Sequence, residues 1–541
     1  MRRCIHAALA AVVIASNAHG QDVVRVSGGI GLSTDMTHRT GGLTSPGIPD
    51  VIHRASVQLS VTLFDDIVLP FSAYVTSLDA GYTQPFNQFG IHPRFGDALT
   101  VHAGYFSQRI SDLSFGDARL FGVGVEASPG QFRASAFYGT TMEARNPDAT
   151  RGFSGDYLRR AWGGSFGYKS DGGGAQFNVL YATDDETSIR PDSTTRPPAE
   201  NLVTTLSFSA SAGEALTFDG EIGLAMYTAD VRASLLDSND RNPFVESLIA
   251  FNSSTSLDYA GKASAALTVS EHVSFRGGIS WLGPGYISLG FVQMFNDMLD
   301  ITISPTIRIG DNTVILQGTV GQRTNNLAGT RESAMSQLII SANVTSRLSD
   351  DLSVDISLAN FGQRNSARND TLRISNISRY LSASPRYVFT ALGLNHTLSA
   401  TVFIQESEDQ NILSPNRTKN DNRSIGLSHI LSIPSGWSFT TSLNHFASAT
   451  NGLELTLLSI NESINTSLFD NTVNTGLTLG INAIQSAAGS TQLFARFFAS
   501  RSFDSFGTLM LVLATNSFDY AATGALAATE SNGSLQYSIS F

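Results

Sequence analysis

The chain has 541 residues and a formal net charge of −12; 42% of its residues are hydrophobic and 15% are Asp, Glu, Lys or Arg. The negative charge argues against a nucleic-acid-binding protein, because such proteins carry a basic footprint for the phosphate backbone. After residue 21 no stretch reaches the roughly 18 consecutive apolar residues of a transmembrane helix, which excludes a multi-helix membrane protein.

The first twenty residues have the pattern of a secretory signal peptide. Arg2 and Arg3 precede a short apolar run at 7–15, and small residues at Ala18 and Gly20 fit a cleavage site before residue 21. The run is too short to span a bilayer. We therefore predict a signal peptide at 1–20 and export of the chain.

The mature chain, 21–541, is predicted to be a single domain without thiol chemistry. The one cysteine, Cys4, lies inside the signal peptide, so no disulfide or thiolate metal ligand would remain. No separate plug domain is expected at the N-terminus, because strand-like sequence begins near Val23.

Alternation of apolar and polar residues is the main signal after the signal peptide. In the segment 56–63 every second residue is Val or Leu, and the residues between them are Ser, Gln or Thr. Further alternating segments are found at 301–309, 352–358 and 398–404. Successive side chains of a strand point to opposite faces, so each segment has one apolar and one polar face.

Short turns and long loops alternate between these segments. The short turns are at 65–66, 95–97, 129–130, 172–174, 213–214, 271–272, 310–311, 350–351, 393–394, 434–436, 470–471 and 504–505. The longer polar stretches include 35–50, 142–158, 185–200, 230–255, 362–377 and 407–421. Outer-membrane barrels have this asymmetry, with short periplasmic turns and longer extracellular loops.

These signals predict an all-β fold, a large antiparallel transmembrane β-barrel. Twelve short turns, with both termini in the periplasm, give about 26 strands, and errors in the strand boundaries allow about 22 to 28. A soluble β-sandwich also alternates, but many segments here reach the ten or so residues of a strand that crosses a bilayer. The segments 88–94 and 285–296 follow the pattern least regularly.

The C-terminus carries a second, independent signal. Leu535, Tyr537, Ile539 and Phe541 alternate with polar residues, and the chain stops on the phenylalanine. This ending resembles the C-terminal recognition strand that the barrel-assembly machinery of Gram-negative bacteria reads. We therefore expect the protein in the cell outer membrane, surrounded by lipid and lipopolysaccharide.

Several passages carry a family resemblance. They are 84–90 (Gln-Pro-Phe-Asn-Gln-Phe-Gly), His92-Pro93, 99–105, 122–126 and Pro129-Gly130, followed by 288–290, 296–297 and 321–327. In these passages the chain resembles a group of uncharacterised outer-membrane β-barrel proteins of Bacteroidetes-type bacteria. The resemblance implies a location and a fold, and it implies no activity.

The sequence offers little chemistry, and we expect no catalytic residue, no cofactor and no metal site. His272 and Ser274 have the spacing of a His/Ser pair used by barrel phospholipases, but they lie at a short inner turn, far from where such enzymes hold the pair. The histidines lack the paired spacing of a zinc site. His92 and His102 flank a hairpin and are expected to approach each other as a packed or hydrogen-bonded pair.

A barrel of this size encloses a lumen that wall side chains alone cannot fill. The favoured function is a porin-like channel, or a transporter of solutes or peptides. The alternative is a surface or secretion-complex subunit whose lumen or loops bind a partner protein, and a barrel enzyme comes third. The segment 82–117 is predicted to form a constriction or docking element, or else a packed outer loop. The candidate constriction residues are Gln84, Asn87, Gln88 and Phe89, and the candidate lumen charges are Arg308 and Asp355.

Overall fold

The structure, a computed structural model, describes most of the chain after residue 23. The described ranges are 24–41, 49–78, 88–116, 118–148, 152–235, 248–249, 251–291, 294–311, 313–367, 373–409, 419–486, 489–520 and 528–541. Within these ranges the regular secondary structure is all β-strand, and no helix is long and apolar enough to cross a membrane. The predicted signal peptide lies outside the described residues.

Twenty-seven strands are formed by the described residues. They are β1 (Val24–Thr40), β2 (Val51–Leu63), β3 (Ile67–Thr76), β4 (Gln88–Ile91), β5 (Arg94–Phe95), β6 (Leu99–Gln108), β7 (Ala118–Ala127), β8 (Phe132–Met142), β9 (Leu158–Ser170), β10 (Gly173–Asp185), β11 (Glu200–Ala212), β12 (Leu216–Thr228), β13 (Thr255–Ser270), β14 (Val273–Leu282), β15 (Met298–Ile309), β16 (Val314–Asn325), β17 (Met335–Arg347), β18 (Leu352–Asn365), β19 (Ser375–Ala391), β20 (Leu394–Asp409), β21 (Lys419–Ser432), β22 (Trp437–Thr450), β23 (Leu453–Leu468), β24 (Val473–Gln485), β25 (Ser490–Phe503), β26 (Gly507–Tyr520) and β27 (Ala528–Ser540).

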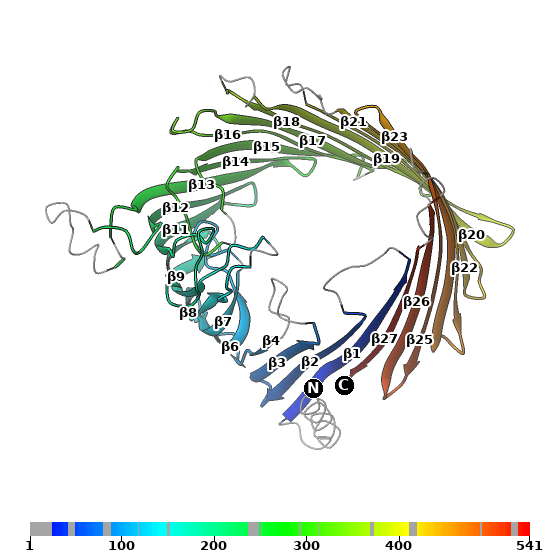
Figure 1. The fold of residues 1–541 in the computed structure, drawn as a ribbon, viewed down its shortest axis with the longest axis horizontal. Coiled ribbons are helices and arrows are strands. Elements are labelled where there is room, and N and C mark those ends of the chain that lie inside the picture. Colours follow the sequence, from blue (N-terminus) through cyan, green and yellow to red (C-terminus); the bar gives the residue numbers. More distant parts are fainter. Residues whose placement is uncertain are drawn as a thin grey trace.

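The strands form one closed antiparallel barrel. Each strand pairs with its neighbours in the chain, and β27 pairs with β1 to close the sheet (Figure 1). The short strands β4 and β5 share one position between β3 and β6, so 27 strands fill 26 positions. The predicted fold and strand number are confirmed.

A proline explains the break between β4 and β5. Pro93 has no N–H group, so it cannot donate a hydrogen bond to a neighbouring strand. The flanking residue His92 still donates its backbone N–H to the carbonyl of Pro70, 2.9 Å away. The carbonyl of Pro93 accepts from the N–H of Val101 at 2.8 Å. The irregular segment 88–94 therefore keeps its place in the wall as two half-strands.

All twelve predicted short turns join consecutive strands, and all lie at the same end of the barrel. Several use a left-handed backbone conformation, for example Gly130 (φ 62°) and Asn471 (φ 65°). Val24 is paired with Leu63 beside one of these turns, and the C-terminal strand also ends there. We call this the short-turn end and the opposite end the long-loop end.

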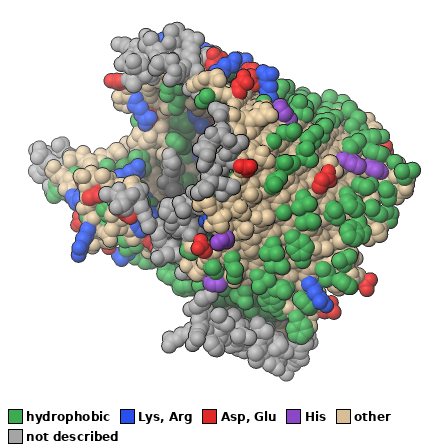
Figure 2. Space-filling model, turned by 45° about the vertical axis from the view of Figure 1, so that its right-hand side comes forward, with side chains coloured by type: hydrophobic (Ala, Val, Ile, Leu, Met, Phe, Trp, Pro, Cys, Tyr) green, Lys and Arg blue, Asp and Glu red, His purple; other side chains and the backbone are tan. Residues whose placement is uncertain are grey.

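The wall has an apolar exterior and a mostly polar interior. On neighbouring strands Ile303 and Val320 lie side by side on the exterior, and their side chains are 51% and 50% exposed. Thr302 and Thr319 point to the opposite, lumen face by the alternation of the strands. Figure 2 shows many hydrophobic side chains on the exterior of the side that faces the viewer. An exposed apolar band of this kind is the surface that lipid covers in barrels.

The predicted C-terminal signal segment is the closing strand. Gly28 donates its N–H to the carbonyl of Phe541 at 2.8 Å, and Phe541 donates back to Gly28 at 3.0 Å. Leu535 and Phe541 are exposed on the exterior. Because β27 pairs on both sides, the sheet has no free edge. Recognition of this segment by an assembly machinery stays a prediction.

We predict that an arginine on the exterior destabilises the barrel far more than one on the lumen face. Ile303→Arg should lower the free energy of unfolding in lipid vesicles by about 2–4 kcal/mol, because the charge would face hydrocarbon. Thr302→Arg, one residue away on the lumen face, should lower it by much less. Urea titration followed by tryptophan fluorescence measures both, and equal effects would contradict the assignment of faces.

Candidate functional site

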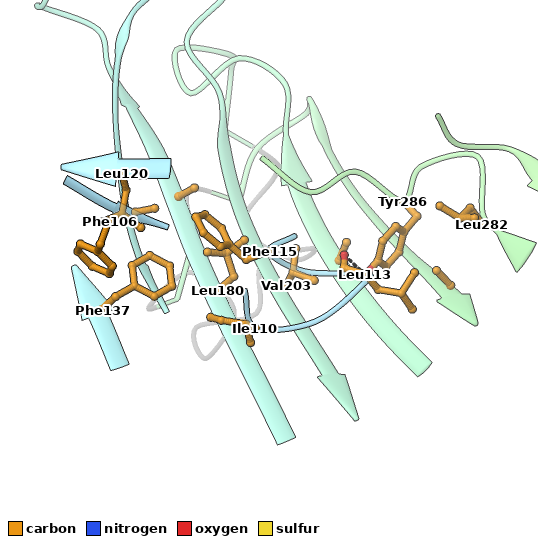
Figure 3. Close-up of a cluster of buried hydrophobic side chains, with 14 residues drawn as sticks. Phe106, Ile110, Leu113, Phe115, Leu120, Phe137, Leu180, Val203, Leu282 and Tyr286 are labelled. Atoms are coloured by element: carbon orange, nitrogen blue, oxygen red, sulfur yellow. Dashed lines mark hydrogen bonds between the residues drawn. The ribbon is translucent and has the colours of Figure 1, made fainter. Parts of the chain in front are cut away.

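Two connections at the long-loop end fold into the lumen. They are residues 109–116, after β6, and 283–297, after β14, of which 292–293 lie outside the described residues. We call them the inner loop pair. The hydroxyl of Tyr286 donates to the carbonyl of Leu113 at 3.0 Å, and the hydroxyl of Ser288 donates to the carbonyl of Ser114. The two loops are therefore held to each other, inside the barrel (Figures 1 and 3).

The inner loop pair packs on an apolar part of the lumen wall. Leu113, Phe115 and Tyr286 have no exposed surface, and the ring of Phe115 lies 4.8 Å from that of Phe137. The wall side chains beneath the loops are Leu180, Ala182, Val203, Ala225 and Ala260. Figure 3 labels Leu180 and Val203 among them. Burying each large side chain contributes roughly 1.5–3 kcal/mol, so the loops are bound to the wall as a fixed element.

Glu221 anchors the first loop. Its side chain is on β12, faces the lumen, and is 7% exposed. One carboxylate oxygen accepts from the backbone N–H of Asp112 at 3.1 Å, and the other accepts from that of Leu113 at 3.2 Å. A buried carboxylate without such partners would be strongly unfavourable. The two amides account for its position on the wall.

Asn201 anchors the second loop. Its side-chain amide, fully buried on β11, donates to the carbonyls of Ile287 and Met226, both at 2.9 Å. Its oxygen accepts from the N–H of Leu289 at 3.0 Å. One buried side chain of the wall thus binds both a carbonyl group and an N–H group of the loop backbone.

Two glycines allow close contacts, one between wall and loop and one between the two loops. A Cβ atom at Gly223 on β12 would lie 2.6 Å from the hydroxyl of Tyr286. A Cβ atom at Gly290 would lie 2.3 Å from the carbonyl oxygen of Ser114.

Burial raises the pKa of the Tyr286 hydroxyl well above its ordinary range, and the charge of Glu221 raises it further to a lesser degree. The hydroxyl therefore remains a hydrogen-bond donor at any physiological pH.

A hollow of about 620 Å³ opens beside the inner loop pair on the lumen face of β8–β15. Its basic lining residues are Arg133, Lys169 and Lys262, and its acidic lining residues are Asp112, Asp219, Glu221 and Asp300. Asp112 forms an ion pair with Arg109, and Asp300 forms one with Arg323 at 2.7 Å. Among the described residues no carboxylate forms an ion pair with the three basic lining residues, and no basic side chain forms one with Asp219 or Glu221. The hollow therefore has three unpaired basic groups and two unpaired carboxylates.

The structure describes two of the four predicted constriction residues. Gln84 and Asn87 lie outside the described residues. Gln88 and Phe89 are in β4, in the wall. Phe89 points to the exterior, where it is 55% exposed and its ring lies 5.6 Å from that of Phe121. Within the predicted segment 82–117, the part that enters the lumen is therefore 109–116.

The predicted lumen charges are on separate strands. Arg308 on β15 alternates with exterior Ile307 and Ile309, and so shares the lumen face with Asp300. Asp355 on β18 lies between exterior Val354 and Ile356, so it also faces inward. The structure does not bring these two charges together.

The predicted histidine pair is confirmed. The Nδ1 atoms of His92 and His102 are 3.2 Å apart, and the ring of His102 stacks on Phe106 with centroids 4.9 Å apart. Glu126 lies 3.6 Å from the other side of the His102 ring. Across the described ranges, no group of three or more His, Cys, Asp or Glu residues has the geometry to hold a metal ion.

Comparison with known proteins gives no family. No protein-family model and no curated protein matches the sequence. Among solved structures, the P pilus usher (PapC) translocation pore is similar with a TM-score of 0.37 and 9% identity over 96% of this chain and 100% of that one. The FrpB iron transporter from Neisseria meningitidis gives 0.38 and 12% identity, covering 95% of this chain and 81% of that one. A point mutant of the ferric enterobactin receptor (PfeA) from Pseudomonas aeruginosa gives 0.42 and 9% identity, covering 95% and 80%.

Superpositions this loose transfer no activity to the chain. The resemblance to barrels of Bacteroidetes-type bacteria gains no independent support and stays a prediction.

The predicted constriction segment 82–117 includes the first loop of the inner loop pair, but sequence reasoning missed the second loop and the anchors Glu221 and Asn201. One signal was present, because the segment 285–296 departs from the alternation. A second was the run of apolar residues on lumen positions of consecutive strands, such as Leu180, Val203 and Ala225. Apolar residues on both faces of a strand indicate that the lumen face is covered as well.

We predict that removing the carboxylate of Glu221 releases the first loop. Glu221→Ala leaves two buried amides without an acceptor, which should weaken loop docking by about 1–3 kcal/mol. Hydrogen exchange of the amides in 109–116 should then become faster, while exchange in the strands stays slow. Asp219→Ala, two residues away on the same face, is the control. Unchanged exchange in the Glu221 variant would show that the carboxylate does not hold the loop.

Proposed function

We propose that the protein is an outer-membrane channel that passes small hydrophilic solutes through a lumen narrowed on one side by the inner loop pair. The observation that carries this proposal is the closed ring of 26 strand positions with a lumen face built mainly of Ser, Thr, Asn and Gln. The favoured interpretation of the sequence was a porin-like channel, and the geometry supports it.

The size of the ring argues for a wide lumen. Strands lie about 4.8 Å apart and tilt by about 40° in membrane barrels, so 26 of them form a circle of about 25 Å radius. Wall side chains reach inward by only a fraction of that radius. The inner loop pair covers the lumen face of one part of the wall, mainly β8–β14.

The exterior supports a place in a membrane. Its apolar band needs hydrocarbon around it, and the closed hydrogen-bond ladder leaves no strand edge unpaired in that hydrocarbon. Both ends of the barrel sheet, Val24 and Phe541, lie at the short-turn end. Outer-membrane barrels keep their short turns in the periplasm. The signal peptide predicted at 1–20 would deliver the chain there.

Unpaired basic groups outnumber unpaired carboxylates in the hollow by three to two, which favours anions. Arg133, Lys169 and Lys262 line it without carboxylate partners among the described residues, although the whole chain is acidic. Fixed charge on a lumen wall raises the local concentration of counter-ions. We therefore propose that the channel prefers anionic over cationic solutes.

We expect purified protein in a planar lipid bilayer to give large, stable conductance steps. Replacing residues 110–115 by a Gly-Ser linker of equal length should increase the step size, because the docked loop would no longer narrow the lumen. The variant must keep the heat-modifiable band of a folded barrel on a gel. Bilayers that stay silent with folded wild-type protein would contradict the channel.

Reversal potentials in a salt gradient test the selectivity. The double variant Lys169→Glu and Lys262→Glu should move the reversal potential towards that of a cation-preferring channel, because two positive charges in the hollow become negative. Gln322 lies opposite Ile301 on the exterior, so Gln322→Glu adds a charge outside the lumen and should leave the reversal potential unchanged. The same reversal potential in all three proteins would refute a selective role of the hollow.

A second candidate, a barrel that holds a partner polypeptide in its lumen, is favoured by one observation. Three aromatic residues form a stacked row on the lumen face of β18–β20, with ring centroids 6.4 Å apart between Phe361 and Tyr380 and 6.3 Å between Tyr380 and Phe403. Apolar rings on an otherwise polar wall can bind apolar side chains. A silent bilayer, together with a polypeptide that co-purifies with wild type and is lost from Phe361→Ala/Phe403→Ala, would favour this function over a channel.

A further inference from the structure

Polar and ionisable side chains interrupt the apolar exterior over β20–β23. His396 on β20 and His429 on β21 are joined by a hydrogen bond of 3.0 Å between their ring nitrogens. Thr441 on β22 donates to a carboxylate oxygen of Glu462 on β23 at 2.9 Å. His445 lies on the same exterior face of β22. We call these five residues the exterior polar patch.

The acid of the patch lies inside the apolar band and not at its rim. On β23 Glu462 is flanked by Ile460 and Ile464, and across the sheet it faces Leu479 on β24. All three apolar side chains are exposed on the exterior. Figure 2 shows this side of the barrel, where acidic and histidine side chains stand within a field of hydrophobic ones.

A carboxylate in this position is unfavourable in a lone barrel. An ionisable side chain that faces hydrocarbon loses its hydration, and proteins keep such residues where a partner satisfies them. Thr441 supplies one hydrogen bond to Glu462. Among the described residues no basic side chain forms an ion pair with this carboxylate, so its charge is not balanced within the barrel. A base from another molecule in the membrane would balance it.

We propose that the exterior polar patch is the interface between two copies of this chain, with Glu462 of each copy paired to His445 of the other. The patch is complementary to itself, because it carries an acid and bases on one face. A two-fold axis along the membrane normal makes such an interface reciprocal: if the acid of one copy meets the base of the second, the converse holds as well. The proposal rests on the barrel being embedded in a membrane, and it does not depend on conduction.

The depths of the two residues fit this axis. His445 is nine residues from Gly436, at the end of one short turn, and Glu462 is seven residues from Phe469, at the start of the next. With strands tilted by about 40°, two residues of difference correspond to about 5 Å in depth. A two-fold axis along the normal keeps every residue at its own depth, so the two side chains can meet across it.

Charge argues for a second copy over a lipid head group. An anionic head group would suit the histidines, but it would be repelled by Glu462. Head groups also lie at the edge of the hydrocarbon, whereas Glu462 has apolar neighbours on both sides along its strand. A partner for this patch must offer both a base and an acid at matching depth, and a second copy does.

The first experiment measures the mass of the protein in lipid nanodiscs by native mass spectrometry. Wild-type protein should be a dimer, and Glu462→Leu should shift at least nine-tenths of it to monomer. This variant replaces a lipid-facing charge by an apolar residue, so the monomer should still fold. Gln322→Leu, a polar-to-apolar change on the exterior of β16, is the matched control and should leave the dimer intact.

The second experiment tests the pairing itself. Glu462→His places histidine opposite histidine, and His445→Glu places acid opposite acid, so each single variant should be monomeric. The exchanged variant Glu462→His/His445→Glu restores the complementary pair and should be a dimer again. Loss of a general apolar contact would not be reversed in this way.

Three results would overturn the proposal. They are a monomeric wild type in nanodiscs, a dimer that survives Glu462→Leu, and an exchanged variant that stays monomeric. Association with a different polypeptide in place of a second copy would overturn it as well. Failure here is distinguishable from failure of the channel, because conductance of the monomeric variants in planar bilayers tests the channel separately.

Discussion

A backbone amide in hydrocarbon has no water to bond, and the closed barrel follows from how the chain satisfies its amides. The amides are satisfied by a ladder of backbone hydrogen bonds that runs through 26 strand positions. The ladder is completed where β27 pairs with β1. Gly28 and Phe541 exchange two hydrogen bonds at this seam. Because the ladder is closed, no strand edge is left unpaired, and the apolar side chains on the exterior can face lipid.

Closing so many strands leaves a wide space inside the barrel. A ring of this size leaves a lumen that its own side chains cannot fill, and a polar wall admits water. The chain uses two of its long-loop connections to cover part of that wall. Glu221 and Asn201 hold these loops by their backbone amides and carbonyls, and Leu113, Phe115 and Tyr286 pack on apolar wall positions. The result is a lumen with one side covered by docked loops and a remaining wall that is mostly polar and includes Arg308 and Asp355.

The exterior has one marked departure from its own rule. Lipid favours an unbroken apolar band, yet Glu462 lies within it, and three histidines face outward on the adjacent strands. Nothing in the barrel's closure or in the lumen requires these residues to face outward. The constraint that governs them is the same one that governs the backbone: a polar group in hydrocarbon must find a partner. The lumen loops meet this constraint within one chain, whereas the exterior polar patch meets it only between chains.

The sequence by itself determined the class of fold, the number of strands and the position of all twelve short turns. These properties are local, because alternation and turn chemistry are set by residues adjacent in the chain. The sequence also indicated the pairing of His92 with His102, since a hairpin brings them together. The inner loop pair was decided only by the tertiary structure. Glu221 and Leu113 are 108 residues apart, and Tyr286 and Leu113 are 173 residues apart. Which strand faces which loop across a lumen depends on the curvature of the closed sheet, and no local pattern encodes that curvature.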